Sequence, residues 1–378
     1  MKAPRVIGGV CLSVNPEGCM GEVRRWIEAE KALPSLASGP QSVLVLGCSG
    51  GYGLASRVVS AFGAGAATLG VSVERLPTFK RQGTPGWYNN LAFDALAAEA
   101  GLFSDTLVAD AFLDETRAAV IARARERHLP KFDLVVYSLA APQRTDPATG
   151  VAYRSVIKPV GQTLSGQTLD VASGTLADVT LEAATPEEVE ATVKVMGGED
   201  WQLWLRALKE ADRLAEGAMT VAYSYVGPTS TYAIYRSGTL GKAKEHLERS
   251  AHEINRLLEP LKGRAFVSVN KALVTRASSV IPIMSVYVAA MYKVMKAKGL
   301  HEGCLEQSGR LFRERLYAGG GVPVDGEGRI RIDDWELRED VQAEVADILS
   351  RVTPENLAEL TDAEGCRRDL MAIYGFDR

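Results

Sequence analysis

Short runs of apolar residues alternate with amphipathic stretches through the first 140 residues of the chain. The apolar runs cover 42–47, 66–73, 104–109 and 133–140, and the stretches between them cover 54–62, 87–101 and 116–128. Continuous apolar runs of this length are typical of strands buried on both faces, and the longer amphipathic stretches are typical of helices. Strands that alternate with helices predict right-handed β-α-β units and a parallel sheet. A further amphipathic helix is predicted at 17–31.

The pattern changes after residue 140. Residues 141–182 contain turn signals and β-like pieces separated by glycines, which predicts a β-hairpin insertion or flap. Helices are predicted at 185–196, 201–217 and 242–261, and strands at 219–227 and 264–271. Residues 277–378 are mainly helical, apart from a polar segment at 329–339. Trp201 and Trp204 are interpreted as core residues.

These elements predict a doubly wound parallel sheet of the Rossmann type, an α/β fold, in a single domain over residues 1–378. Within it we distinguish the insertion at 141–182 and the helical part at 277–378. The most apolar later run, 278–292, contains Pro282 and is shorter than the about 20 residues that a membrane span requires. It therefore predicts a core helix, and no membrane span is expected.

Composition excludes several classes of protein. The formal net charge is −4, so no basic surface points to nucleic acid as a partner. The five cysteines are scattered and the four histidines form no ligand pattern, so we predict no metal site. Unpaired cysteines indicate reduced thiols in a cytoplasmic protein. We expect a monomer, although the sequence does not determine the oligomeric state.

A glycine-rich turn follows the first strand of the sheet. Its glycines are Gly47, Gly51 and Gly53, and the next residues begin a helix. Such a turn lets phosphate approach main-chain N–H groups, and the helix N-terminus adds partial positive charge. A purely structural turn is the alternative. The strand–turn–helix context favours a dinucleotide site.

Further candidate residues follow the other strands, at the sheet edge where ligands bind in such folds. Glu74 ends the second strand, where a carboxylate can accept hydrogen bonds from the adenine-ribose hydroxyls and repel a 2′-phosphate. It therefore favours NADH over NADPH, while the neighbouring Arg75 weakens that preference. Asp110, 139–140 and 273–275 lie at the ends of later strands.

A tyrosine and a lysine flank the start of the helix predicted at 242–261. Tyr235 precedes the helix and Lys244 lies inside it. A phenol beside an ammonium group can donate a proton to a developing oxyanion. Most such pairs are only a half-buried ring and a solvated charge. A catalytic role for this pair is supported mainly by the dinucleotide site predicted around it.

Taken together, the motifs resemble those of the single-chain enoyl reductases, namely trans-2-enoyl-CoA reductase and the FabV-type enoyl-acyl-carrier-protein reductase. The resemblance runs nearly end to end. The segments that carry it are 47–57, 133–142, 195–201, 223–227, 270–276 and 331–336, together with the eight residues between Tyr235 and Lys244. That spacing is longer than in ordinary short-chain dehydrogenases.

The resemblance implies a function and a set of site residues. The chain is expected to reduce the trans-2 double bond of enoyl-CoA or enoyl-acyl-carrier protein with NADH, in fatty acid synthesis. Tyr235 is expected to donate the proton with help from Lys244, and Tyr225 to contact the acyl substrate and share the thioester oxygen. The residues expected to bind the cofactor are Gly47, Cys48, Ser49, Gly50, Gly51, Tyr52, Val73, Glu74, Asp110, Ala111, Leu139, Ala140, Lys244, Leu273, Val274 and Thr275. Val73 departs from the family, in which this position is often aromatic.

Two other functions fit part of the pattern. A carbonyl reductase of the short-chain dehydrogenase type also uses a tyrosine and a lysine, but would reduce a keto thioester. A non-catalytic module that senses redox state through bound NAD would need the glycine turn but not the Tyr235–Lys244 pair. Neither the carrier of the acyl group nor its chain length can be read from the residues.

Overall fold

One parallel sheet organises the structure. The computed structural model describes residue 4, residues 6–7 and residues 10–376. Within them seven strands pair in the order β13-β12-β11-β6-β3-β4-β5, and every pairing in this sheet is parallel. The strands are β3 (Ser42–Leu46), β4 (Ala67–Ser72), β5 (Ser104–Val108), β6 (Phe132–Tyr137), β11 (Leu214–Ser224), β12 (Arg264–Val269) and β13 (Arg329–Arg331). The predicted fold class is confirmed.

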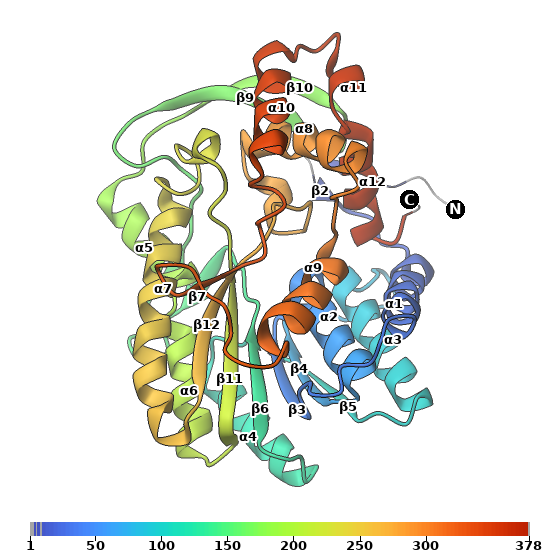
Figure 1. Cartoon of the computed structure of the whole chain (residues 1–378), viewed down its shortest axis with the longest axis vertical. Helices are drawn as coiled ribbons and strands as arrows, with labels where there is room; N and C mark the ends of the chain where they lie inside the picture. Colours follow the sequence, from blue (N-terminus) through green and yellow to red (C-terminus); the bar gives the residue numbers. More distant parts are fainter. Residues whose placement is uncertain (1–3, 5, 8–9, 377–378) are drawn as a thin grey trace.

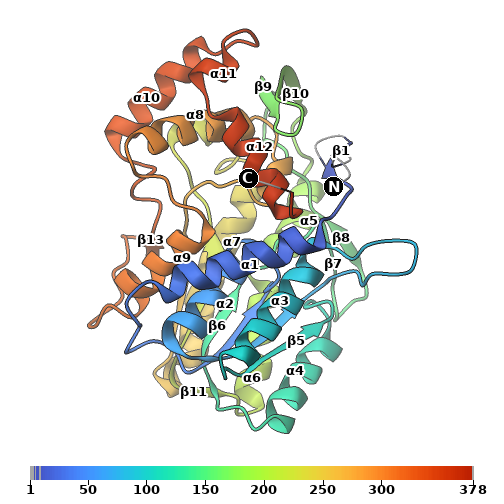
Figure 2. The ribbon, with the colours of Figure 1, turned by 90° about the vertical axis from the view of Figure 1, so that its right-hand side faces the viewer.

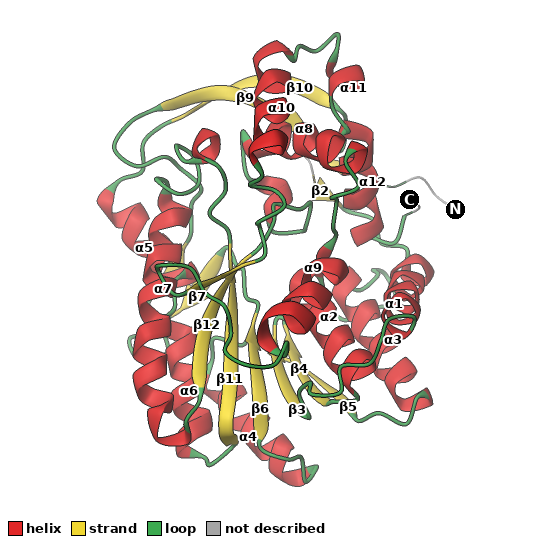
Figure 3. Cartoon of the chain, viewed as in Figure 1, coloured by secondary structure: helices red, strands yellow, loops and turns green. Residues whose placement is uncertain are grey.

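Helices cover both faces of the sheet, as Figures 1 and 3 show. One layer contains α1 (Pro16–Lys31), α2 (Gly51–Val58), α3 (Pro85–Glu99) and α9 (Cys304–Leu311), and the other contains α4 (Asp114–Glu126), α6 (Glu199–Glu210) and α7 (Thr239–Leu258). Helix α5 (Pro186–Met196) packs on α7. Successive side chains of β3 point to opposite faces, so Val43 and Val45 join the first core and Leu44 and Leu46 the second. Burial on both faces is why this strand is apolar throughout.

The order of the strands fixes where a ligand binds. From β3 the chain builds β4 and β5 on one side, then returns to place β6 on the other side of β3. In folds of this type the loops that leave two such strands diverge, and the ligand-binding crevice is expected at this point, beyond the carboxyl ends of the strands. The glycine turn lies at this crevice, because it directly follows β3.

A second group of elements gathers beyond those carboxyl ends (Figures 1 and 2). It comprises α8 (Met284–Ala297), α10 (Glu339–Arg351), α11 (Leu357–Leu360), α12 (Ala363–Ile373) and the hairpin of β9 (Leu164–Asp170) and β10 (Thr175–Leu181). A small antiparallel pair, β1 (Val6–Ile7) and β2 (Val10–Cys11), lies near it. A third core joins α8 and α12 to Tyr235 and Leu273. The C-terminal part of the chain therefore packs against the segments that carry Tyr235 and Leu273.

The structure corrects several predicted elements. The insertion at 141–182 is two hairpins, because β7 (Gln143–Thr145) and β8 (Ala152–Arg154) pair separately from β9 and β10. The helix predicted at 201–217 is wrong beyond Glu210: Asp212 adopts a φ of 57°, and Leu214 already pairs with Phe132. Strand β13 was not predicted. Helix α8 begins at Met284, after Pro282, and none of the described helices is long and apolar enough to cross a membrane.

Candidate active site

The turn between β3 and α2 forms an open cradle of main-chain groups. Gly47 has a φ of +88°, and a Cβ there would lie 2.1 Å from the Ser138 carbonyl oxygen. A Cβ at Gly53 would lie 2.0 Å from the Gly47 oxygen, so both positions require glycine. No described heavy atom lies within 4 Å of the Cβ position of Gly50, and no side chain caps α2. Free N–H groups at a helix N-terminus that faces open space fit a dinucleotide pyrophosphate.

Two glycines of this cradle should respond differently to replacement by alanine. Gly50→Ala should leave the melting temperature unchanged, because the backbone at Gly50 is extended and the space beside it is empty. The added methyl group should occupy that space and so weaken NADH binding about 10-fold or more. Gly53→Ala should instead lower the free energy of unfolding by roughly 1–3 kcal/mol through its clash with the turn. Thermal melts and NADH titration by fluorescence measure both. A normal NADH affinity of the Gly50→Ala variant would show that this turn does not bind the cofactor.

The cofactor-binding candidates at the ends of β4 and β5 differ in how they are held. The Glu74 side chain is buried. Its carboxylate accepts a 2.6 Å hydrogen bond from Ser49 Oγ and another hydrogen bond from Thr84 Oγ1. This joins the end of β4 to the glycine turn. Val73 is 64% exposed, so it offers an apolar surface at the same edge. Asp110 accepts a hydrogen bond from the Phe112 N–H at 3.0 Å, and Ala111 is buried.

The other end of the crevice is formed by the loops after β6 and β12. Leu139 lies against Gly47, and Ala140 is exposed. Thr275 Cγ2 lies 4.0 Å from the Cβ position of Gly51, so the loop 273–275 faces the turn. The Tyr52 hydroxyl fixes this approach by donating a 3.0 Å hydrogen bond to the Lys271 carbonyl. The structure therefore brings Leu139 and Thr275, one from each loop, to the glycine turn.

Cys48 is the exception among the turn residues. Its side chain has no exposed surface, and its thiol donates to Asn90 Oδ1 at 3.7 Å. Burial raises the pKa of the thiol. Only the main chain of Cys48 can therefore reach a ligand, and its sulfur is a core atom.

Tyr235 and Lys244 flank the carboxyl end of β11. The Tyr235 ring packs edge-to-face against Tyr225, with centroids 4.8 Å apart and planes at 88°. Lys244 Nζ donates a 3.0 Å hydrogen bond to the Tyr223 carbonyl, two residues before Tyr225. Among the described residues, the Tyr235 hydroxyl forms no hydrogen bond, either to Lys244 or to any other group. The phenol is therefore free to donate to a ligand.

Burial shifts the protonation of both side chains. It raises the pKa of Tyr235, so the phenol carries its proton at neutral pH. It lowers the pKa of the Lys244 ammonium to about 8, against the opposing charge of Glu248. A protonated phenol suits a proton donor. The lysine is poised to change its charge just above neutral pH.

Sequence reasoning missed a group of residues behind Tyr225. Tyr225 and Tyr287 both donate to Glu336 Oε1, at 2.8 and 2.7 Å, and Glu336 is fully buried. Lys271 is also buried, and burial lowers its pKa to about 8. Glu336 lies in one of the segments that carry the resemblance, but no local pattern there indicates that it meets Tyr225.

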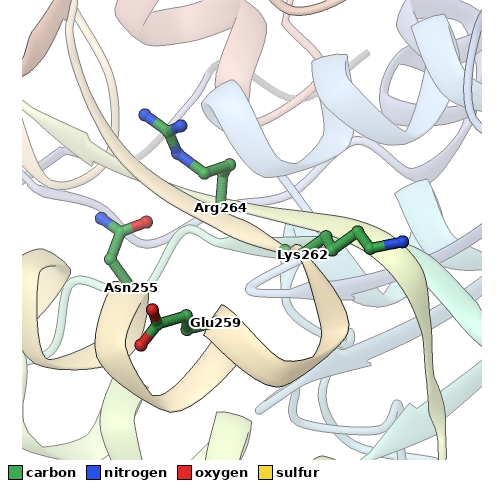
Figure 4. Close-up of a pocket in the computed structure, with 5 residues that line it drawn as sticks. Asn255, Glu259, Lys262 and Arg264 are labelled. Carbon is green, nitrogen blue, oxygen red and sulfur yellow. The ribbon is translucent and has the colours of Figure 1, made fainter.

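A surface hollow of about 430 Å³ lies at the opposite end of β12 (Figure 4). It is lined by Asn255, Glu259, Lys262, Gly263 and Arg264. The Asn255 side chain is already bonded to the Ala265 main chain, and the exposed Lys262 side chain points away from Asn255 and Glu259 and pairs with Glu216. The hollow lies at the amino end of the strand, so it is separate from the crevice.

Comparison with known proteins identifies close relatives of the whole chain. The family described as "Trans-2-enoyl-CoA reductase catalytic region" matches residues 81–317, and the "NAD(P)H binding domain of trans-2-enoyl-CoA reductase" matches residues 1–79. A trans-2-enoyl-CoA reductase [NADH] of Treponema denticola is 54% identical, over 99% of this chain and 95% of that protein. An enoyl-[acyl-carrier-protein] reductase [NADH] of Coxiella burnetii is 49% identical, over 99% and 92%.

Two solved structures of trans-2-enoyl-CoA reductases are similar to this chain over its whole length. The Treponema denticola trans-2-enoyl-CoA reductase in complex with NAD has a TM-score of 0.95 at 53% identity, covering all of this chain and 95% of that one. The Clostridium acetobutulicum trans-2-enoyl-CoA reductase in complex with NADH has a TM-score of 0.96 at 45% identity, with the same coverage.

A third family description, "Enoyl reductase FAD binding domain", matches residues 324–378. The described residues of this segment form β13, α10, α11 and α12, and the inner faces of α10 and α12 are packed against α8. No glycine turn follows a strand there, and a Cβ at Gly365 would already lie 2.1 Å from the Asp362 carboxylate. These residues do not form a cradle for a flavin, and we assign no flavin site to them.

Proposed function

This chain belongs to the trans-2-enoyl-CoA reductase family, and we propose that Tyr235 and Lys244 carry its reaction, the NADH-dependent reduction of the trans-2 double bond of an enoyl thioester. The observation that supports these two residues most directly is the Tyr235 phenol itself. It is buried, protonated and without a partner among the described residues, at the carboxyl end of β11 beside Tyr225. The same enzyme class serves fatty acid synthesis.

The chain's own residues supply the polar part of the chemistry. Bound NADH provides the hydride for the β-carbon of the substrate. Negative charge then develops on the thioester oxygen, where the Tyr235 hydroxyl donates a hydrogen bond or its proton, and a proton is finally delivered to the α-carbon to give the saturated acyl thioester. Lys244 holds the nicotinamide ribose, and it does not make the phenol more acidic, because burial alone shifts the pKa of Tyr235 and raises it. The turn 47–52 and Glu74 hold the other half of the dinucleotide.

One assay separates this function from its alternatives. NADH consumption is followed at matched concentrations of crotonyl-CoA, a longer enoyl-CoA, an enoyl-acyl-carrier protein and acetoacetyl-CoA. We expect turnover with the enoyl thioesters and none with acetoacetyl-CoA. Turnover of acetoacetyl-CoA alone would favour the carbonyl reductase. NADH binding without turnover of any substrate would favour a redox-sensing module. The ratio of rates on the two carriers identifies the preferred one.

Glu74 is proposed to select NADH. Its carboxylate would repel a 2′-phosphate, and two like charges 4 Å apart in water repel by about 1 kcal/mol. Glu74→Ala should therefore raise kcat/KM for NADPH relative to NADH at least about 5-fold. The measured quantity is the ratio of kcat/KM for NADPH to kcat/KM for NADH. Loss of the hydrogen bonds to Ser49 and Thr84 affects both cofactors alike and therefore cancels in this ratio.

Arg75 provides the control for this prediction. It is exposed beside Glu74 and is the nearest cation in sequence for a 2′-phosphate. Adding Arg75→Ala to the Glu74→Ala variant should reverse the gain in NADPH use. An unchanged ratio in the single variant would exclude Glu74 as the selector.

We also propose a monomer located in the cytoplasm. The five cysteines are free thiols, and four of them are buried, as suits a reducing compartment. The outer strand β13 has only three residues, so it offers little edge for pairing with a second copy. Light scattering coupled to size-exclusion chromatography measures the mass, and a dimer would contradict this proposal.

A further inference from the structure

One buried carboxylate connects four separate segments of the site. Glu336, which follows β13, accepts hydrogen bonds from Tyr225 after β11 and from Tyr287 in α8, both at Oε1. Its Oε2 accepts the Ala272 N–H, after β12, at 2.8 Å. Gln342 in α10 closes the arrangement by donating to the Glu336 carbonyl at 2.6 Å and to the Tyr287 hydroxyl at 3.1 Å.

The partners of Glu336 indicate that it is ionised. The Ala272 N–H can only donate, and a carboxylate accepts from it and from both phenols without conflict. Burial raises the pKa of Glu336, while these three bonds and the positive charge of Lys271 oppose that shift. A buried anion with three donors is well satisfied, whereas a neutral carboxyl or amide would leave at least one of these donors without an acceptor.

The bond to Glu336 determines what Tyr225 can do. A phenol has one proton, and that of Tyr225 is directed to the carboxylate. Tyr225 therefore cannot also donate to the thioester oxygen, which the sequence left open. Its ring still supports Tyr235, whose own hydroxyl has no partner among the described residues.

We propose that Glu336 is a positioning residue that binds the Tyr225 hydroxyl and so holds the Tyr225 ring against Tyr235, leaving Tyr235 as the sole phenolic donor. The inference depends on the proposed function. Glu336 acts through Tyr225, so loss of either side chain removes the same support. The two substitutions should therefore not add.

A double-mutant cycle in the full-length enzyme tests this. Glu336→Gln and Tyr225→Phe should each lower kcat for crotonyl-CoA about 10-fold. The double variant should lie within about 2-fold of the slower single variant, and the NADH dissociation constant should stay within about 2-fold of wild type. Should the Gln variant fail to accumulate, Glu336→Asp, which keeps the charge but shortens the reach, enters the same cycle.

Asp333 provides a matched control from the same segment. It is also fully buried, but its carboxylate pairs with Arg331, and among the described residues it forms no hydrogen bond to Tyr225, Tyr235 or Tyr287. Asp333→Asn should lower the melting temperature with little change in kcat, whereas Glu336→Gln should lower kcat beyond any such effect. Equal kcat losses in the two variants would show a purely structural role and overturn the inference.

The remaining outcomes are also decisive. Losses in the cycle that multiply, or a normal kcat for the Glu336 variant, would overturn the role of Glu336 while leaving enoyl reduction intact. Failure of the wild-type enzyme to reduce any enoyl thioester would instead overturn the proposed function.

Discussion

Replacement of Tyr235 by phenylalanine should lower kcat with crotonyl-CoA by about 10²–10³-fold, the usual cost of removing one oxyanion donor. The phenylalanine ring keeps the edge-to-face packing on Tyr225, so the fold should be retained. The NADH dissociation constant should change only modestly, because the lost hydroxyl serves the substrate oxygen. Steady-state kinetics and fluorescence titration of NADH separate the two effects.

Tyr232 supplies the control for this substitution. It lies in the same turn before α7 and has no role in the proposed chemistry. Tyr232→Phe should therefore turn over at close to the wild-type rate. If Tyr235→Phe did the same, another group would have to protonate the substrate and the assignment would be wrong.

Replacement of Lys244 by methionine should lower kcat/KM by about 10²-fold. Methionine preserves the apolar stem but loses both the charge and the donor that now reaches the Tyr223 carbonyl. Because Lys244 is proposed to hold the nicotinamide ribose, we expect part of the loss in the KM for NADH. Lys242→Met is the matched control, since Lys242 lies in the same helix, is half-exposed and pairs with Glu245 on the helix surface.

The pH dependence gives a second measurement on Lys244. Burial lowers its pKa to about 8, so it is cationic below that pH and neutral above it. Wild-type kcat/KM should therefore fall as the pH rises through about 8, while Tyr235, whose pKa is raised, keeps its proton. The residual activity of the Lys244→Met variant should lack this fall. Persistence of the fall in that variant would assign it to another group.

The elements that form the proposed cofactor site were predictable because they depend on local patterns. Apolar runs such as 42–46 identify strands buried on both faces, and the glycines that follow are required by contacts within their own turn or with the adjacent loop. Alternation of strands and helices predicts the parallel sheet and hence the edge at which ligands bind. The predicted parallel sheet is confirmed in six of the seven strands that the described residues form, and the seventh, β13, was not predicted.

Predictions failed where tertiary contacts outweigh local preference. Residues 214–217 were predicted as the end of a helix, but the sheet draws Leu214 into register with Phe132 and ends α6 at Glu210. Strand β13 is short and polar, so only its pairing with β12 makes it a strand. Neither outcome follows from the residues in the segment alone.

The sequence by itself determined the parallel sheet, the glycine turn proposed to bind phosphate and the tyrosine–lysine pair, because each is specified within a short window of residues. Only the tertiary structure decided how the pair is supported. Tyr225 and Glu336 are 111 residues apart, and they meet because the segment after β13 returns to the carboxyl end of β11. A buried carboxylate acquires its role from whichever donors the fold brings to it, and that convergence has no signature in the chain.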